Sequence, residues 1–334
     1  MLSKAKLPDH SILAALRAAY GIMPTALEFL PVGNDSRAWS YRVEAEGARY
    51  FAKLRRGKLK SAALLVPHYL QRLGIQSAVA PLPTAPGQLS APVNAAFSLI
   101  LYPFITGRSA MRMPLKPAQW RACGEIMRAI HTAPVSSQLQ QVIKREQFGV
   151  KWLQTITRVE GAMASVRFSS DTAKRFAEIW REQADQIALC IQRYRALGET
   201  LRRQAPPFVI CHADIHTDNI IITDKGALRI VDWDEALLAP IERDLMFFLG
   251  DGHAPRSEAA FLAGYGDAQI DRAAIAYYRY DWVLQEFADY GERVFLSSDL
   301  AEQVLAQALQ EFEKLFAPGD VVQRASAAFQ AIPE

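Results

Sequence analysis

The sequence lacks the features of secreted, membrane-spanning and nucleic-acid-binding proteins. Its 334 residues include three cysteines, Cys123, Cys190 and Cys211, too few and too widely spaced for a disulfide framework or a zinc site. It has no apolar run of about 18 residues to span a membrane, and its first 21 residues contain no apolar run long enough for a signal peptide. The net charge is +3, without a lysine- and arginine-rich tract interleaved with aromatics. We therefore expect a cytoplasmic protein that binds neither membranes nor nucleic acids.

Two nucleotide-binding signatures are also missing, the Walker sequence and the G-x-G-x-x-G loop. Half of the residues are hydrophobic and 22% are charged, which is typical of a globular protein with a sizeable core. The length favours one large domain or two lobes.

The first hundred residues predict a small β-rich lobe. A short helix is expected over residues 9–20, ended by Gly21. Alternating apolar and polar residues then predict an antiparallel sheet. Its strands are expected at 27–32, 40–46 and 49–54, followed by a helix at 59–73 and an apolar strand within 97–107.

The rest of the chain predicts helices around one β-rich island at 208–235. The helices are expected at 117–131, 146–164, 171–197, 257–263, 271–292 and 299–316. The predicted fold is α+β and bilobal, as in protein kinases. We expect a nucleotide-binding lobe at 1–102, a connection at 103–107, and a catalytic, acceptor-binding helical lobe at 108–334. A cleft between two such lobes suits a nucleotide.

The main chemical signal is the run His212-Ala213-Asp214-Ile215-His216-Thr217-Asp218-Asn219 between two apolar strands. Its spacing matches the H-x-D-x-x-x-x-N catalytic loop of kinase-type phosphotransferases. A hydroxyl that attacks phosphorus must lose its proton, so a carboxylate has to face it. Asp214 is the predicted catalytic carboxylate. Asn219 and Asp232, which follows the strand expected at 228–231, are predicted Mg²⁺ ligands, because Mg²⁺ prefers one or two carboxylates with phosphate and water oxygens.

The nucleotide, ATP or GTP, needs a cation and a place for its base. Lys53 alternates within the third strand and is predicted to reach the α- and β-phosphates. The polar turn at 33–40 is expected to cover the phosphates through backbone N–H groups and the Ser36 hydroxyl. In the connection that follows Tyr102, the Pro103 carbonyl and the Ile105 N–H are expected to bind the base, since proline has only an acceptor.

These motifs resemble the aminoglycoside phosphotransferase family. CHADIHTDN is similar to that family's catalytic loop, IVDWDE to its magnesium-binding segment, and the following APIERDLMF also fits. The resemblance implies a nucleoside triphosphate donor, Mg²⁺ and an antibiotic-like acceptor. The sequence departs from kinase-like folds in one respect, because no acidic residue lies between Glu46 and Glu125 to pair with Lys53. Ser61 or Asp232 is expected to orient Lys53 instead.

The acceptor is expected to be a bulky, hydroxylated cation bound by acidic and aromatic residues. The predicted acceptor residues are Asp234, Glu235, Trp233, Asp281 and Trp282. The aromatic members would offer flat faces to a cyclitol or a cation. Spectinomycin, another aminocyclitol, a basic cyclic peptide, choline, homoserine and methylthioribose all remain candidates. If the protein is an enzyme of this kind, we expect it to confer antibiotic resistance. The alternative is a catalytically inactive kinase-like binding protein.

Overall fold

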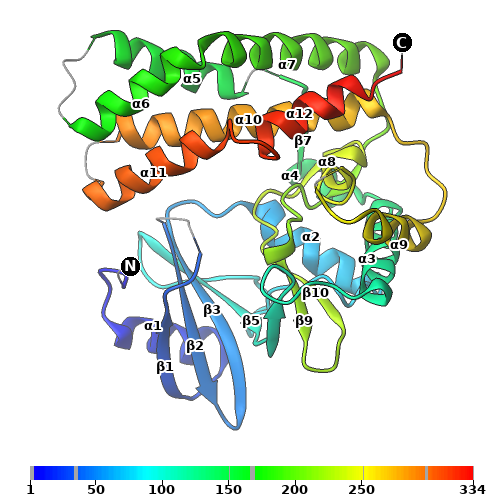
Figure 1. The fold of residues 1–334 in the computed structure, drawn as a ribbon. Coiled ribbons are helices and arrows are strands. Elements are labelled where there is room, and N and C mark those ends of the chain that lie inside the picture. Colours follow the sequence, from blue (N-terminus) through cyan, green and yellow to red (C-terminus); the bar gives the residue numbers. More distant parts are fainter. Residues whose placement is uncertain are drawn as a thin grey trace. The chain divides into compact units, whose positions relative to one another are not determined.

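The computed structural model describes residues 4–33, 37–149, 151–165, 170–250, 252–297 and 300–333, which form two compact units (Figure 1). Unit 1 comprises Met1–Lys144, Val209–Leu238 and Ala259–Asp267. Unit 2 comprises Arg145–Phe208, Ala239–Glu258 and Ala268–Glu334. The β-rich island at 208–235 therefore belongs almost entirely to the same unit as the N-terminal sheet.

The N-terminal region is an antiparallel sheet with the strand order β1-β2-β3-β5-β4, as the alternation predicts. Its strands are β1 (Pro24–Leu30), β2 (Ala38–Ala45), β3 (Ala48–Arg56), β4 (Ala91–Pro92) and β5 (Phe97–Pro103). Helix α1 (Asp9–Tyr20) has the predicted bounds and ends at Gly21, whose φ of 66° suits glycine.

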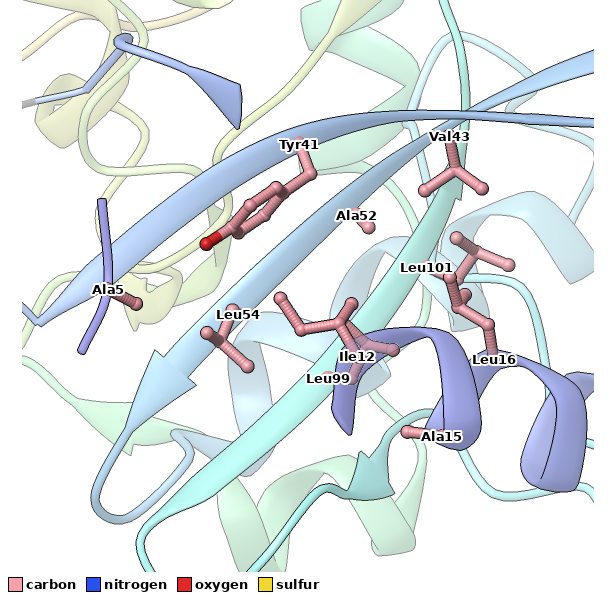
Figure 2. Packing of buried hydrophobic residues seen from close by; sticks show 10 residues of the cluster. All are labelled: Ala5, Ile12, Ala15, Leu16, Tyr41, Val43, Ala52, Leu54, Leu99 and Leu101. Atoms are coloured by element: carbon pink, nitrogen blue, oxygen red, sulfur yellow. The ribbon is translucent and has the colours of Figure 1, made fainter. Parts of the chain in front are cut away.

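Helix α1 covers one face of this sheet. Ile12 and Leu16 pack among side chains from β2, β3 and β5, as Figure 2 shows. Both are fully buried, and burial of such a side chain contributes about 1.5–3 kcal/mol. The remaining members of this cluster are Ala5, Ala15, Tyr41, Val43, Ala52, Leu54, Leu99 and Leu101.

Strand β3 divides its side chains between this core and the opposite face. Ala52 and Leu54 are buried in the core, whereas Phe51, Lys53 and Arg55 are only partly buried. Successive side chains of a strand point to opposite faces, so these last three residues share the face away from α1. The core thus determines which face carries the cations.

The β-rich island contributes two of its strands to a second small sheet in unit 1. The island consists of β8 (Val209–Cys211), a 3₁₀ turn at Thr217–Asn219, β9 (Ile220–Thr223) and β10 (Leu228–Ile230), and β8 belongs to a separate sheet. Strand β9 pairs antiparallel with β10 on one side and with β6 (Gly107–Ser109) on the other. Strand β6 begins two residues after Ile105, so this pairing ties the predicted base-binding connection to the catalytic loop.

Gly107 permits that pairing, and Gly107→Ala is expected to destabilise unit 1. A Cβ atom at this position would lie 2.2 Å from the Ile222 backbone oxygen. The backbone of a paired strand can move only slightly to relieve this clash. The substitution should therefore lower the free energy of unfolding by about 1–3 kcal/mol. Thermal unfolding checks this. The matched control is Gly161→Ala, at a helical glycine with open space around its Cβ position, where alanine should stabilise. Equal midpoints for both variants would contradict the prediction.

The other helices of unit 1 are α2 (Ser61–Arg72), α3 (Pro117–His131) and α4 (Ser137–Val142), and helix α9 (Pro255–Tyr265) lies largely in this unit. Helix α2 includes Pro67 in its interior and has no acidic residue. Strands β7 (Lys144–Arg145) and β11 (Leu237–Ala239) each contain a position at which the chain passes from unit 1 to unit 2.

Unit 2 is helical and built around α10 (Arg272–Phe295). Four helices pack against α10, namely α5 (Lys151–Ser165), α7 (Ala184–Gln204), α11 (Glu302–Lys314) and α12 (Val321–Gln330). Stacked and edge-on rings fill the core of unit 2, including Phe176 against Phe312 with ring centroids 4.0 Å apart. The remaining described helices of this unit are α6 (Asp171–Glu182) and α8 (Glu242–Leu245).

The structure corrects two details of the predicted helices. The single helix expected at 171–197 is two helices, α6 and α7, because Gln183 leaves helical geometry with φ −100° and ψ 9°. The break contains neither glycine nor proline, so nothing in the local sequence marks it. The helix expected at 146–164 begins only at Lys151, since residues 146–149 form a loop. Within the described segments, every helix is too short or too polar to cross a membrane.

Candidate functional site

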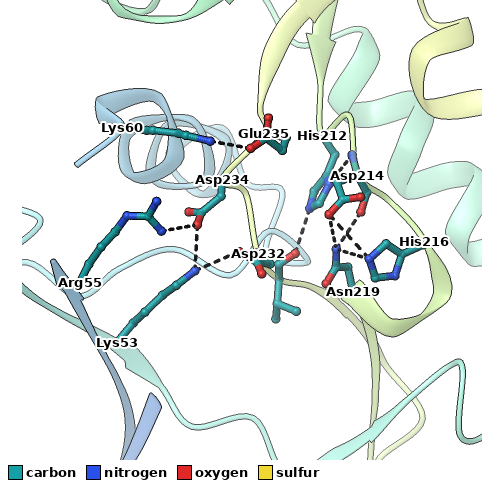
Figure 3. A network of polar contacts seen from close by, with 11 residues as sticks. Lys53, Arg55, Lys60, His212, Asp214, His216, Asn219, Asp232, Asp234 and Glu235 are labelled. Atoms are coloured by element: carbon teal, nitrogen blue, oxygen red, sulfur yellow. Dashed lines mark hydrogen bonds and ion pairs between the residues drawn. The ribbon is translucent and has the colours of Figure 1, made fainter. Parts of the chain in front are cut away.

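The catalytic loop is held in unit 1 by the buried side chain of His212 (Figure 3). Its Nε2 lies 2.9 Å from the Val231 carbonyl oxygen, and its Nδ1 accepts a hydrogen bond from the Asp214 N–H at 3.3 Å. A carbonyl oxygen only accepts, so Nε2 carries the proton and the imidazole is neutral. His212 therefore links the loop to the end of β10 and orients the backbone of Asp214.

Asn219 closes the loop onto Asp214. Its amide nitrogen donates to the Asp214 carbonyl oxygen at 2.7 Å and to Asp214 Oδ2 at 3.3 Å. Since the amide nitrogen is used inside the loop, the carbonyl oxygen Oδ1 is left as the group that a cation can use. The Asn219 residue is 8% exposed, and it lines the large pocket described below.

The carboxylate of Asp214 remains accessible although its backbone is fixed. Its side chain is 43% exposed, and Oδ2 lies 3.7 Å from His216 Nε2. A carboxylate on a fixed loop that still meets solvent can accept a proton from a bound hydroxyl.

Two residues of this region hold strained backbone conformations. Ala213 has φ of 67° and Asp232 has φ of 60°, where residues other than glycine are uncommon. Such conformations cost about 1–3 kcal/mol each and cluster at functional sites. Ala213 precedes the predicted catalytic carboxylate, and Asp232 is the predicted metal ligand. The strain therefore lies where the sequence motifs predict chemistry.

Lys53 is paired with two carboxylates from the segment after β10. Its Nζ lies 3.1 Å from Asp232 Oδ1 and 3.0 Å from Asp234 Oδ2 (Figure 3). The Lys53 side chain is 15% exposed. The structure thus brings Lys53 and Asp232 together, and it adds Asp234 as a second partner.

The charges of this cluster stabilise one another. Burial lowers the pKa of Lys53, but the Asp232 and Asp234 carboxylates outweigh burial, so the pKa lies above its ordinary value. Burial raises the pKa of Asp234, but Lys53 and Arg55 outweigh it and hold the pKa below its ordinary value. Lys53 and Asp234 are therefore charged at neutral pH.

Further ion pairs balance the negative charge of the DWDE segment. Arg55 Nη1 donates to Asp234 Oδ2 at 3.0 Å, and Lys60 Nζ lies 2.5 Å from Glu235 Oε1. Sequence reasoning expected Asp234 and Glu235 to attract a cationic acceptor, because unpaired excess charge is costly. The structure corrects that argument, since cations of the chain itself already neutralise both carboxylates.

A pocket of about 1010 Å³ in unit 1 collects most of the predicted nucleotide-binding residues. Lys53, Asn219 and Asp232 line it, together with Tyr102, Pro103 and Ile105 from the predicted connection. Burial and then the nearby Asp234 and Asp232 raise the pKa of the Tyr102 phenol, which therefore remains a neutral O–H donor. Ser36 lies outside the described residues.

Some residues of this pocket were not identified by sequence reasoning. They include Phe51 and Arg112. Phe51 lies opposite Tyr102 in the β3–β5 ladder, with ring centroids 6.3 Å apart. The signal for Phe51 was available, because side chains two residues apart on a strand share a face and Lys53 is two residues away. Arg112 follows β6, and nothing in its local sequence connects it with the pocket.

Trp233 is part of the core. It is 3% exposed, its Nε1 donates to the Ile230 carbonyl oxygen at 3.2 Å, and its ring lies 4.7 Å from the His212 ring. Trp233 is among the residues that line the large pocket, but its burial leaves little of the flat face that we expect to meet a cyclitol or a cation. It instead supports the histidine that fixes the catalytic loop.

Asp281 and Trp282 lie on α10 in unit 2. Asp281 Oδ1 accepts hydrogen bonds from Trp152 Nε1 at 3.0 Å and from the Tyr194 hydroxyl at 3.1 Å. Trp282 Nε1 donates to Glu286 Oε1 at 2.9 Å. Both predicted acceptor residues thus have partners inside their own unit.

Comparisons with known proteins bear on the family and the fold of this chain. Residues 27–283 match the model of the family described as "Phosphotransferase enzyme family". No curated protein matches the sequence. Among solved structures, a crystal structure of spectinomycin phosphotransferase APH(9)-Ia with ADP and spectinomycin is similar over 96% of this chain and 98% of its own, with 28% identity and a TM-score of 0.87. The resemblance to spectinomycin phosphotransferase that the DWDE and ERDLM segments carry is thereby confirmed.

Other solved structures share the kinase-like fold at lower similarity. An aminoglycoside phosphotransferase from Alicyclobacillus acidocaldarius is 14% identical, with a TM-score of 0.64 over 98% of this chain and 96% of its own. Choline kinase LicA from Streptococcus pneumoniae is also 14% identical, with a TM-score of 0.55 over 96% of this chain and 99% of its own. At such identities the likeness concerns the fold alone. The predicted α+β fold, with an antiparallel N-terminal sheet and a helical C-terminal region, is confirmed.

Proposed function

Since the chain belongs to the phosphotransferase enzyme family, we propose that it transfers the γ-phosphate of ATP or GTP to a hydroxyl group of an aminocyclitol antibiotic of the spectinomycin type. The observation that carries this proposal is the arrangement in unit 1. There the accessible Asp214 carboxylate is bonded to Asn219, and Lys53 is paired with Asp232 at a pocket large enough for a nucleotide.

The nucleotide is proposed to bind with its phosphates at Lys53 and its base at the connection after β5. The Pro103 carbonyl and the Ile105 N–H offer an acceptor and a donor, and both residues line the pocket. Phe51 and Tyr102 add aromatic surface beside them. Because the base is proposed to bind backbone groups, substitutions of the Pro103 and Ile105 side chains should affect nucleotide binding only through changes in packing. The lobe boundaries at 102 and 108 are part of this proposal.

Asn219 and Asp232 fit a magnesium ion. The Asn219 amide nitrogen is occupied by Asp214, which leaves its carbonyl oxygen, and the Asp232 side chain is 49% exposed. A carboxylate and a carbonyl oxygen at one pocket are donors that Mg²⁺ prefers. A magnesium ion held by Asn219 and Asp232 would offset negative charge on the phosphates of a bound nucleotide.

Asp214 is proposed to take the proton of the acceptor hydroxyl. The hydroxyl oxygen forms a bond to the γ-phosphorus while the bond from that phosphorus to the β,γ-bridging oxygen breaks. The proton passes to the Asp214 carboxylate, and the products are the phosphorylated acceptor and the nucleoside diphosphate. His212 holds Asp214 through its backbone rather than as a base, because the imidazole is buried and bonded at both nitrogens.

The acceptor class rests on the structure that is 28% identical over nearly the whole chain and contains spectinomycin. It does not rest on Asp234 or Glu235, whose charges are balanced within unit 1. Asp281 and Trp282 on α10 remain the proposed acceptor-side residues, and Trp282 is partly exposed. Choline kinases share only the fold with this chain, so choline is a comparison substrate.

Purified protein is expected to phosphorylate spectinomycin in preference to primary metabolites. The test compares kcat/KM for spectinomycin, a basic cyclic peptide, choline, homoserine and methylthioribose, each with ATP and with GTP. Protein carrying Asp214→Ala, prepared in parallel, controls for contaminating kinases. A primary metabolite that exceeds spectinomycin by a hundredfold or more would show that the enzyme belongs to metabolism. Nucleotide binding without transfer to any acceptor would instead favour an inactive binding protein.

A further inference from the structure

Helix α2 leaves Lys53 without the carboxylate that kinase-like folds usually supply. In protein kinases, the lysine of the third strand pairs with a glutamate of the following helix, and that pair must be in place for activity. Here α2 spans Ser61–Arg72 and has no acidic residue, nor has any position between Glu46 and Glu125. The Lys53 side chain is nevertheless only 15% exposed. A buried ammonium needs a partner, so another element must provide it.

Both partners of Lys53 come from the DWDE segment, and they differ in what else they have to do. Asp232 has a side chain 49% exposed and belongs to the proposed magnesium site. Oxygens that bind a metal ion are less available to Lys53. Asp234 has a side chain 29% exposed and Oδ2 3.0 Å from Lys53 Nζ. Asp234 is thus the partner that Lys53 keeps when Asp232 binds metal.

Arg55 fixes the position of Asp234. Its Nη1 lies 3.0 Å from Asp234 Oδ2, the same oxygen that accepts the hydrogen bond from Lys53 (Figure 3). Arg55 is two residues after Lys53 on β3, so both cations project from one face of the strand. Its side chain is 14% exposed. Two partly buried charge-assisted hydrogen bonds converge on one oxygen, and such bonds hold their groups more firmly than neutral ones.

We propose that Asp234 is the positioning residue for Lys53 and that Arg55 holds it there, so that the DWDE segment replaces the missing helix carboxylate. The proposal rests on the proposed function, because it concerns the lysine that binds the phosphates. In this arrangement one strand-end segment carries the metal carboxylate at Asp232 and the lysine carboxylate at Asp234. Lys53 is then directed at the phosphates by β3 and by this segment together.

Asp234→Asn is the first test, because asparagine keeps the shape and removes the charge. ADP affinity is measured by calorimetry with Mg²⁺, and kcat and KM for ATP are measured with spectinomycin. Loss of the charged Asp234 partner of Lys53 should weaken ADP binding and raise KM for ATP by about tenfold, the equivalent of 1.4 kcal/mol. The spectinomycin KM should stay unchanged. The matched control is Glu28→Gln on β1, whose exposed ion pair with Arg42 should contribute little.

Substitutions of Arg55 form the second test, and they test the proposal independently if Asp234→Asn fails to fold. Arg55→Met should weaken ADP binding in the same direction, and Arg55→Lys should restore most of it, because the restored cation can still hold Asp234. The double variant Asp234→Asn/Arg55→Met should bind ADP no more weakly than Asp234→Asn alone. Each change disrupts the same interaction between Arg55 and Asp234, so the two losses should not add.

An Asp234→Asn variant that binds ADP as tightly as the wild type, or more tightly, contradicts the inference. Asp234 would then merely hold Lys53 away from the nucleotide. Additive losses in the double variant contradict it as well. Wild-type protein that binds no ADP would overturn the proposed function itself, so the two failures are distinguishable.

Discussion

Asp214→Ala is expected to lower kcat by about 10²–10⁴-fold, the range that a positioned general base contributes. The carboxylate acts on the acceptor hydroxyl in the transition state, so ADP affinity should remain close to that of the wild type. His212 cannot replace it, because its imidazole is buried and bonded at both nitrogens. Steady-state kinetics with spectinomycin and calorimetry with ADP check both parts.

The control for this variant is Asp224→Ala, which removes an exposed carboxylate from the turn between β9 and β10. It should leave kcat unchanged. Near wild-type turnover by Asp214→Ala would remove Asp214 from the reaction. A parallel loss of ADP affinity would show that the loop had lost its structure. The Asn219 side-chain amide donates to both the carbonyl oxygen and the carboxylate of Asp214, so the substitution removes one of these two bonds.

Asp232→Asn is expected to abolish most of the Mg²⁺-dependent part of nucleotide binding and to lower kcat by about 10²-fold or more, since a metal ion at a phosphoryl group contributes several kcal/mol. Asparagine suits this position, because it tolerates the left-handed backbone that Asp232 adopts. The substitution therefore removes charge without adding backbone strain.

Calorimetric titration with ADP, with and without Mg²⁺, separates the metal contribution from the rest. In the variant the two affinities should converge, and the metal-free affinity should be unchanged or tighter, because one negative charge near the phosphates is gone. Glu28→Gln, which changes an exposed carboxylate on β1, should keep the wild-type difference. An unchanged metal dependence in Asp232→Asn would exclude Asp232 from the metal site.

The catalytic motif was predictable because its chemistry depends on local spacing. Five residues separate Asp214 from Asn219, and the structure joins the two side chains by a hydrogen bond within one loop. Helix α1 was predictable for a similar reason, since Gly21 supplies the left-handed residue that ends it. The break at Gln183 was not, because no residue there has a strong preference against helix.

The roles in the DWDE segment could not be predicted in the same way. In the sequence Trp233, Asp234 and Glu235 directly follow the predicted metal ligand Asp232, and this position suggested that the three residues share a task at the acceptor. In the structure Trp233 packs against His212, Asp234 bonds to Lys53 and Arg55, and Glu235 pairs with Lys60. These partners lie about 175–181 residues away for the carboxylates, so no local pattern records them.

The sequence by itself determined the α+β fold and the phosphotransferase class, and it predicted candidate residues for the chemistry. Strand alternation, the spacing from Asp214 to Asn219, and the strand before Asp232 are all local properties, and local geometry dictates them. Only the tertiary structure decided the partners of Lys53, because α2 offers no carboxylate and the pairing of β3 with the segment after β10 depends on packing across the chain. Charge and burial are properties of that packing, since a carboxylate's task depends on which cation lies within hydrogen-bonding distance.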